Sequence, residues 1–110
     1  MPDKEESEFL EELKEEFLDG VFFELDDCEE FILKFEKSAD RNDLLELKKK
    51  LHSMKGSAQA VQIDNVAEYL HKLESTIDHL EKLKSDRIVN VVLEEIDHLR
   101  KFFENLKEAA

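Results

Sequence analysis

The fold is decided by residues 44–61, which read LLELKKKLHSMKGSAQAV. The apolar residues in this stretch recur at steps of three and four, which places them on one face of an α-helix. They are Leu44, Leu47, Leu51, Met54, Ala58 and Val61. Gly56 interrupts the helical pattern, although glycine is about 1 kcal/mol less favourable than alanine inside a helix. No turn nearby needs this glycine, so its presence indicates a functional requirement.

His52 is predicted to lie on the outer surface of this helix. At about 100° per residue, His52, Gly56 and Lys49 point away from the apolar face, and Lys55 lies between that face and solvent. An exposed imidazole would therefore have a cation and a stretch of bare backbone beside it. This arrangement suits a histidine that carries a phosphoryl group and is reached by another protein. Leu45, two turns before His52, also points outward and indicates a docking patch.

The composition indicates one soluble helical domain. The chain has 110 residues, only two glycines and one proline, which leaves few residues for the turns of a β protein. Its formal charge of −13 argues against binding to nucleic acid or to an anionic membrane surface. The longest apolar run, residues 88–93, is too short to span a bilayer. No apolar signal segment begins the chain, so we expect a cytoplasmic location. Cys28 falls on an apolar face and is expected to be a small buried residue.

The first helix is expected over about residues 7–37, where apolar residues again recur at steps of three or four. The pattern passes through Gly20 without a change of register, so this helix is either long and kinked there or split into two. Residues 1–7 are expected to be a flexible N-terminus, and residues 8–110 to form the domain. The inward residues of the first helix are predicted to be Leu10, Leu13, Phe17, Val21, Leu25, Cys28, Ile32 and Phe35.

Three more helices follow. The second begins at about residue 43, the third after a cap at Asp64 or Asn65, and the fourth after the polar link at residues 84–86. Asn65 and Glu68 have the spacing of a capping box. The inward residues are predicted to be Val66, Leu70, Leu73, Ile77 and Leu80, then Ile88, Val92, Ile96, Leu99, Phe103 and Leu106. Four amphipathic helices with short links predict an all-α fold, an antiparallel up-down four-helix bundle with a long N-terminal helix.

The segment HSMKGSA, residues 52–58, resembles the signature of histidine-containing phosphotransfer (HPt) domains. That signature is His-x-x-Lys-Gly followed by small residues, on one helix of a four-helix bundle, and the resemblance extends from about Phe17 to the last helix. It implies that His52 is phosphorylated on a ring nitrogen, that Lys55 helps to neutralise the phosphoryl group, and that Gly56 admits the active site of the partner. Many members have glycine ten residues after the histidine. Because Gln62 stands there, the helix is expected to end differently, for example by running on to Asp64.

The third helix extends the resemblance. His71 and Glu74 are three residues apart and so lie on one side of that helix. The phosphotransfer domains of chemotaxis histidine kinases resemble this chain in having a histidine and a glutamate at this distance from the motif. By that resemblance Glu74 would accept a hydrogen bond from one nitrogen of His52 and leave the other nitrogen free as the nucleophile, with His71 near the site. The nitrogen that reacts depends on the hydrogen bond made by the other.

The resemblance also implies the partners, namely a response-regulator receiver domain and a sensor histidine kinase. We expect them to contact Leu45, Lys48, Lys49 and Gln59 around His52. The chain has no glycine-rich nucleotide loop and no kinase motif, so it is not expected to phosphorylate itself or to bind a cofactor. Mg²⁺ would be supplied by the receiver or the kinase. The domain is expected to be a monomer, either as a free carrier or as part of a larger kinase.

Two other kinds of protein fit parts of the sequence. Glu68 with His71, and Glu95 with His98, match the Glu-x-x-His spacing of di-metal four-helix proteins. Such ligands must project inward, whereas Glu68 and His98 lie off the apolar faces, so we expect no metal site. A helical adaptor without chemistry is the remaining alternative, but it leaves Gly56 unexplained. His79, like His98, is expected to be an ordinary surface residue.

Overall fold

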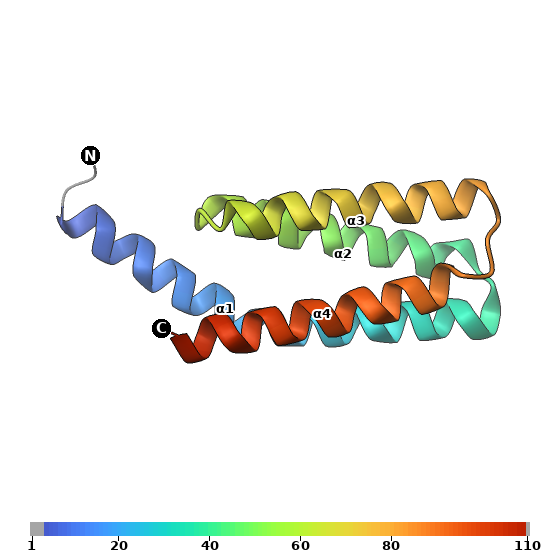
Figure 1. Cartoon of the computed structure of the whole chain (residues 1–110), viewed down its shortest axis with the longest axis horizontal. Coiled ribbons are helices and arrows are strands. Elements are labelled where there is room, and N and C mark those ends of the chain that lie inside the picture. The colour runs from blue at the N-terminus through green and yellow to red at the C-terminus, as the bar shows by residue number, and fades with distance from the viewer. Residues whose placement is uncertain (1–3, 110) are drawn as a thin grey trace.

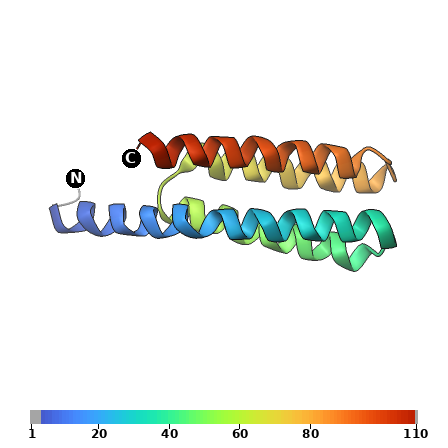
Figure 2. The same cartoon turned by 90° about the horizontal axis from the view of Figure 1, so that it is seen from below.

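The computed structural model describes residues 4–109, and they form an antiparallel bundle of four helices (Figure 1). The helices are α1 (Lys4–Ser38), α2 (Arg41–Ala60), α3 (Asp64–Lys82) and α4 (Ile88–Ala109). Helix α2 packs against both α1 and α3, and α4 packs mainly against α1 (Figure 1 and Figure 2). The predicted all-α up-down bundle is therefore confirmed. Within the described residues, no helix is long and apolar enough to cross a membrane.

The predicted apolar faces form the core. All six residues predicted for the second helix are buried, and no polar or charged side chain among the described residues is fully buried. Phe103 fills the space next to α1, where its ring meets the Phe17 ring edge-on at a centroid distance of 5.8 Å. Cys28 is fully buried, and burial raises the pKa of its thiol to about 12. The cysteine therefore behaves as a small apolar residue, as expected.

Helix α1 is one continuous helix. It begins at Lys4, so residues 4–7 are helical; residues 1–3 of the predicted N-terminus lie outside the described residues. The helix is not split at Gly20, whose φ is not positive. Its N-terminal part changes direction and projects beyond the ends of the other helices (Figure 1). Of the eight residues predicted to face inward, four are fully buried: Val21, Leu25, Cys28 and Ile32.

Three helix ends are closed by a residue with left-handed backbone, and none of these residues is glycine. After α2, the Gln62 N–H donates to the Gln59 carbonyl and the Ile63 N–H donates to the Ala58 carbonyl. This pair of bonds is a Schellman motif, which satisfies carbonyls that would otherwise lack a donor. The φ angles of the three left-handed residues are 53° for Ala39, 62° for Gln62 and 52° for Lys84.

Two expectations for the link between α2 and α3 are wrong. The left-handed backbone of Gln62 ends α2 at Ala60, so the helix does not run on to Asp64. Helix α3 is preceded by Ile63 without a side-chain cap, so neither Asp64 nor Asn65 caps it. Asp64 lies instead in the first turn, where a carboxylate interacts favourably with the helix dipole.

Replacing Gln62 by glycine should stabilise the fold. A left-handed backbone costs a residue with a Cβ about 1 kcal/mol, and glycine does not bear that cost. Gln62→Gly should raise the free energy of unfolding by up to about 1 kcal/mol, measured by urea denaturation. Ser75→Gly in the interior of α3 is the control and should lower the free energy of unfolding. Equal destabilisation by the two substitutions would show that residue 62 is not strained.

Candidate functional site

His52 lies on the outer surface of α2 and faces Glu74 on α3. The distance from His52 Nδ1 to Glu74 Oε1 is 3.4 Å, and the two side chains are 74% and 17% exposed. This distance is long for a hydrogen bond. However, Glu74 Oε1 is sealed from solvent and has no hydrogen-bond donor in the described part of the chain. A buried acceptor gains by finding a donor, so a small rotation of the exposed ring toward Oε1 would be favourable.

The other oxygen of Glu74 is held by Lys55. Lys55 Nζ donates to Glu74 Oε2 at 3.1 Å, and the lysine side chain is only 15% exposed. The lysine charge is therefore partly balanced by the carboxylate, and the carboxylate is fixed between α2 and α3. The resemblance assigned Lys55 to the phosphoryl group. In the structure Lys55 binds Glu74, and its contact with a phosphoryl group stays a prediction.

Gly56 lies one turn beyond His52, and nothing in the fold requires a glycine there. It is exposed, its φ is not positive, and a Cβ added to it would meet no atom within 4 Å. Alanine would therefore fit the space and would favour the helix. The glycine leaves a patch of backbone exposed beside the imidazole.

The predicted partner contacts differ in their exposure. Leu45, Lys48 and Lys49 line one shallow hollow together with His52 and Glu74. Lys49 is 74% exposed, whereas Lys48 is 19% exposed and forms ion pairs on α3. The partners of Lys48 are Asp78, at 2.8 Å, and Glu81, which also pairs with Arg41 at 3.0 Å.

This network of ion pairs was not predicted from the sequence, although the sequence contains a signal for it. Basic residues recur every seven positions along α2, and acidic residues recur at steps of four and three along α3. In an antiparallel pair of helices these rows face each other. The basic row is Arg41, Lys48 and Lys55, and the acidic row is Glu81, Asp78 and Glu74.

Both members of the Lys48–Glu81 pair have shifted pKa values. Partial burial disfavours the charged form of Lys48, but its hydrogen bonds to Asp78 and Glu81 outweigh this and raise its pKa. The hydrogen bond from Lys48 is the main cause that lowers the pKa of Glu81 below its ordinary value of 4.5. The ion pair therefore favours the charged forms of Lys48 and Glu81. It links α2 to α3 on the N-terminal side of His52 along α2.

His71 and Gln59 lie on the other side of Lys55. Both are exposed, and they line a second hollow that also contains Lys55 and Glu68. Within residues 4–109, no hydrogen bond or ion pair joins His71 to His52 or Glu74. His71 therefore lies near Lys55, and a role at His52 stays a prediction.

The two Glu-x-x-His pairs do not face the core. Glu68, His71 and His98 are exposed, and His98 Nδ1 lies 3.8 Å from Glu95 Oε1 on the surface of α4. No group of three or more histidine, cysteine or acidic side chains is placed to hold a metal ion, as far as the described residues show. The inward ligand set that a di-metal bundle needs is not formed by these pairs.

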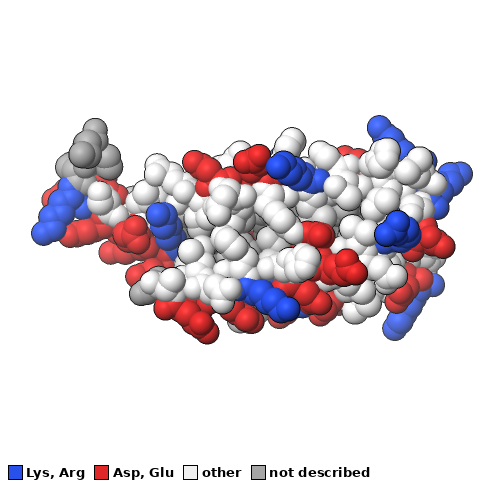
Figure 3. All heavy atoms as spheres, viewed as in Figure 1, with Lys and Arg blue, Asp and Glu red and all other residues white. Residues whose placement is uncertain are grey.

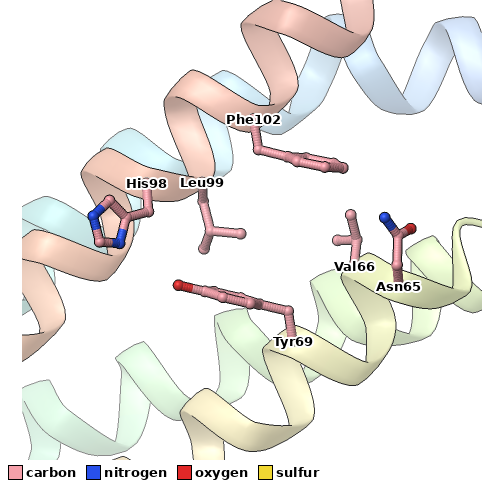
Figure 4. A pocket seen from close by; sticks show the side chains of 6 residues that line it. All are labelled: Asn65, Val66, Tyr69, His98, Leu99 and Phe102. Carbon is pink, nitrogen blue, oxygen red and sulfur yellow. The ribbon is translucent and has the colours of Figure 1, made fainter.

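A further hollow lies between α3 and α4, away from the predicted site. Figure 4 shows Tyr69 and Phe102 on opposite sides of it, with Leu99 and Val66 between them. In the space-filling view, uncharged side chains form the middle of this face and charged ones surround them (Figure 3). The hollow contains none of the predicted site residues, so it belongs to a different surface from His52.

The ion pair of Glu81 should make the stability depend on pH. A carboxyl group whose pKa is lowered by folding adds stability above its ordinary pKa of 4.5, and this is lost as the pH falls through the lowered value. Glu81→Gln should reduce the free energy of unfolding by about 1 kcal/mol at neutral pH, and the difference from wild type should shrink below pH 4.5. Urea denaturation at several pH values measures this, with the exposed Glu104→Gln as control. A difference that does not change with pH would contradict it.

The comparisons agree with the geometry of the site. A family model described as the Hpt domain matches residues 7–109. No curated protein and no solved structure matches the chain. Members of the matched family carry phosphoryl groups on histidine in phosphorelays, and they exchange them with receiver domains and kinases. The match covers nearly the whole chain and includes the exposed His52 with Lys55 and Gly56, so the protein belongs to the Hpt domain family.

Proposed function

We propose that His52 accepts a phosphoryl group from a kinase or a receiver domain and passes it to an aspartate of a receiver domain. The observation that supports this most strongly is the position of the imidazole. The ring is 74% exposed, yet its Nδ1 faces a carboxylate that is 17% exposed. A small rotation of the ring would let Glu74 orient one nitrogen, and the other nitrogen would stay accessible to a partner.

The contact with Glu74 favours Nε2 as the nucleophile. With the proton of the neutral ring on Nδ1, facing Glu74 Oε1, the lone pair is on Nε2. Nε2 attacks phosphorus, a P–N bond forms, and the bond from phosphorus to the donor oxygen breaks. In the onward step an aspartate oxygen attacks phosphorus and the P–N bond breaks. The phosphorylated ring keeps its Nδ1 proton and is a cation, which the charge of Glu74 stabilises.

Lys55 reduces the repulsion between the Glu74 carboxylate and an incoming phosphoryl group. A carboxylate beside His52 would repel a phosphoryl group, but Lys55 Nζ lies 3.1 Å from Glu74 Oε2 and offsets that charge. Phosphoryl transfer depends mostly on positioning and charge stabilisation. In this proposal Lys55 and Glu74 position the ring, and charge stabilisation of the transferred group would come from Mg²⁺ held by the receiver or kinase. Leu45 and Lys49 would contact that partner.

His52→Gln should abolish uptake of acid-labile phosphate. The protein should fold normally because the His52 side chain is largely exposed and is not part of the core. Phosphorylation with acetyl phosphate, followed by mass spectrometry, measures the effect. His71→Gln, His79→Gln and His98→Gln replace the other exposed histidines and should still be phosphorylated. Persistent labelling of His52→Gln would overturn the assignment.

Gly56→Gln should preserve the stability of the fold but reduce phosphoryl transfer from a receiver domain. Glutamine favours a helix by about 0.5 kcal/mol or more over glycine, and no atom lies within 4 Å of an added Cβ, so the fold should be at least as stable. The longer side chain would stand beside His52 and block a receiver domain. Transfer from a phosphorylated receiver should therefore fall much more than labelling by acetyl phosphate.

Gly56→Ala is the matched control, because alanine also favours a helix over glycine but adds only a methyl group. It should raise the melting temperature and leave most of the receiver transfer intact. If Gly56→Gln leaves both transfer rates at the wild-type level, the glycine does not provide access for the partner.

A further inference from the structure

Gly20, the second glycine of the chain, lies in a hollow between α1 and α2. Like Gly56 it is inside a helix, its φ is not positive, and an added Cβ would meet no atom within 4 Å. The hollow has a volume of about 370 Å³, and its apolar lining comes from Leu13 and Phe17 of α1 and from Ala60 of α2. Neither packing nor backbone geometry requires glycine at this position, so its absent side chain keeps the hollow open.

Two carboxylates flank the hollow. Glu16 and Glu24 lie one turn before and one turn after Gly20, on the same side of α1, and both line the hollow. Neither forms an ion pair within residues 4–109; Lys50, the cation that influences Glu24, pairs with Asp27 at 3.4 Å. Burial raises the pKa of Glu24, with Lys50 only partly opposing this. A cation entering the hollow would therefore meet two unpaired carboxylates.

The projecting part of α1 extends the same surface. Residues 4–17 contain seven glutamates and only two lysines. Phe9 is 62% exposed, and Leu13, one turn later, lies at the edge of the hollow. Acidic side chains crowd this end of the molecule in the space-filling view (Figure 3). The surface thus combines an exposed apolar ring, an open hollow and a strong negative charge.

We propose that the hollow at Gly20 is a docking site for an arginine or lysine side chain carried on the apolar face of a helix of a partner protein. The aliphatic stem of the side chain lies over Gly20 and against Phe17 and Ala60, as long basic side chains do on apolar surfaces. Its charged end binds Glu16 and Glu24. Apolar residues of the same helix cover Leu13 and Phe9.

The negative charge of the chain favours a basic partner over a second copy of the same chain. The chain carries a formal charge of −13, and two projecting α1 segments placed together would bring many glutamates close to each other. The site is also close to the phosphotransfer surface, because Ala60 follows Gly56 by four residues, or about 6 Å along α2. A protein bound in the hollow can therefore reach the surface next to His52. Docking itself does not depend on phosphorylation.

The test begins with a displayed library of helical peptides, randomised on one face and selected on the wild-type protein. Gly20→Gln, which fills the hollow with a good helix former, serves for counter-selection, with its folding checked by circular dichroism. Peptides that bind wild type but not Gly20→Gln should share an arginine or lysine at a fixed position between apolar residues. Binding is measured without a phosphodonor, so the result is independent of the chemistry of His52.

One selected peptide is then measured on two variants of equal charge. Glu16→Gln/Glu24→Gln should lower its affinity by about tenfold or more. Glu94→Gln/Glu104→Gln, which removes two exposed acids of α4, should change it by less than about twofold. Sedimentation of the free protein tests for a second copy as the occupant.

Four results would overturn the proposal. They are the absence of any hollow-dependent peptide, hollow-dependent peptides without a basic residue, equal losses of affinity in the two double variants, and self-association of the wild type that Gly20→Gln abolishes.

Discussion

The ion pair between Lys55 and Glu74 is the contact on which the site depends. Both side chains are mostly buried, at 15% and 17% exposed, and they join α2 to α3 beside His52. Removing one partner from such a pair leaves an uncompensated charge, which is costly. Because α2 and α3 are antiparallel, Lys48 and Arg41 continue the row of pairs with the acids of α3. The row fixes the position of Glu74 along α2, and thereby the side of the imidazole that faces the carboxylate.

The division between core and surface explains how a small domain can present the exposed His52 on a stable support. The core within residues 4–109 is entirely apolar, so the hydrophobic effect stabilises the bundle without the site. His52 and Gly56 lie outside that core, and Glu74 is at its edge. The helices therefore act as a rigid support on which polar residues are arranged. Substitutions at His52 and Gly56 are therefore expected to leave the packing of the core largely unchanged.

Apolar periodicity was sufficient to predict four helices, their inward faces and the exposure of His52. It could not predict the helix ends, since the cost of a left-handed Gln62 is small and Ile63, which follows it, packs against the core. The same limit explains the wrong caps at Asp64 and Asn65. The role of Lys55 in holding Glu74 was missed because the resemblance assigned Lys55 to the phosphoryl group, and apolar periodicity does not show which charged side chains of neighbouring helices meet. A single glycine is also weak evidence for the end of a helix, because α1 continues without a break through Gly20.

The protonation of His52 tests the account most directly. The central claim is that Glu74 holds the proton on Nδ1 and leaves Nε2 to carry the phosphoryl group. Nitrogen-15 NMR of the neutral imidazole should show the Nδ1–H tautomer in wild type and a shift toward Nε2–H in Glu74→Ala. After treatment with acetyl phosphate, the phosphorus should couple to Nε2. An Nε2–H tautomer in the wild-type protein, or phosphorus bonded to Nδ1, would contradict the account.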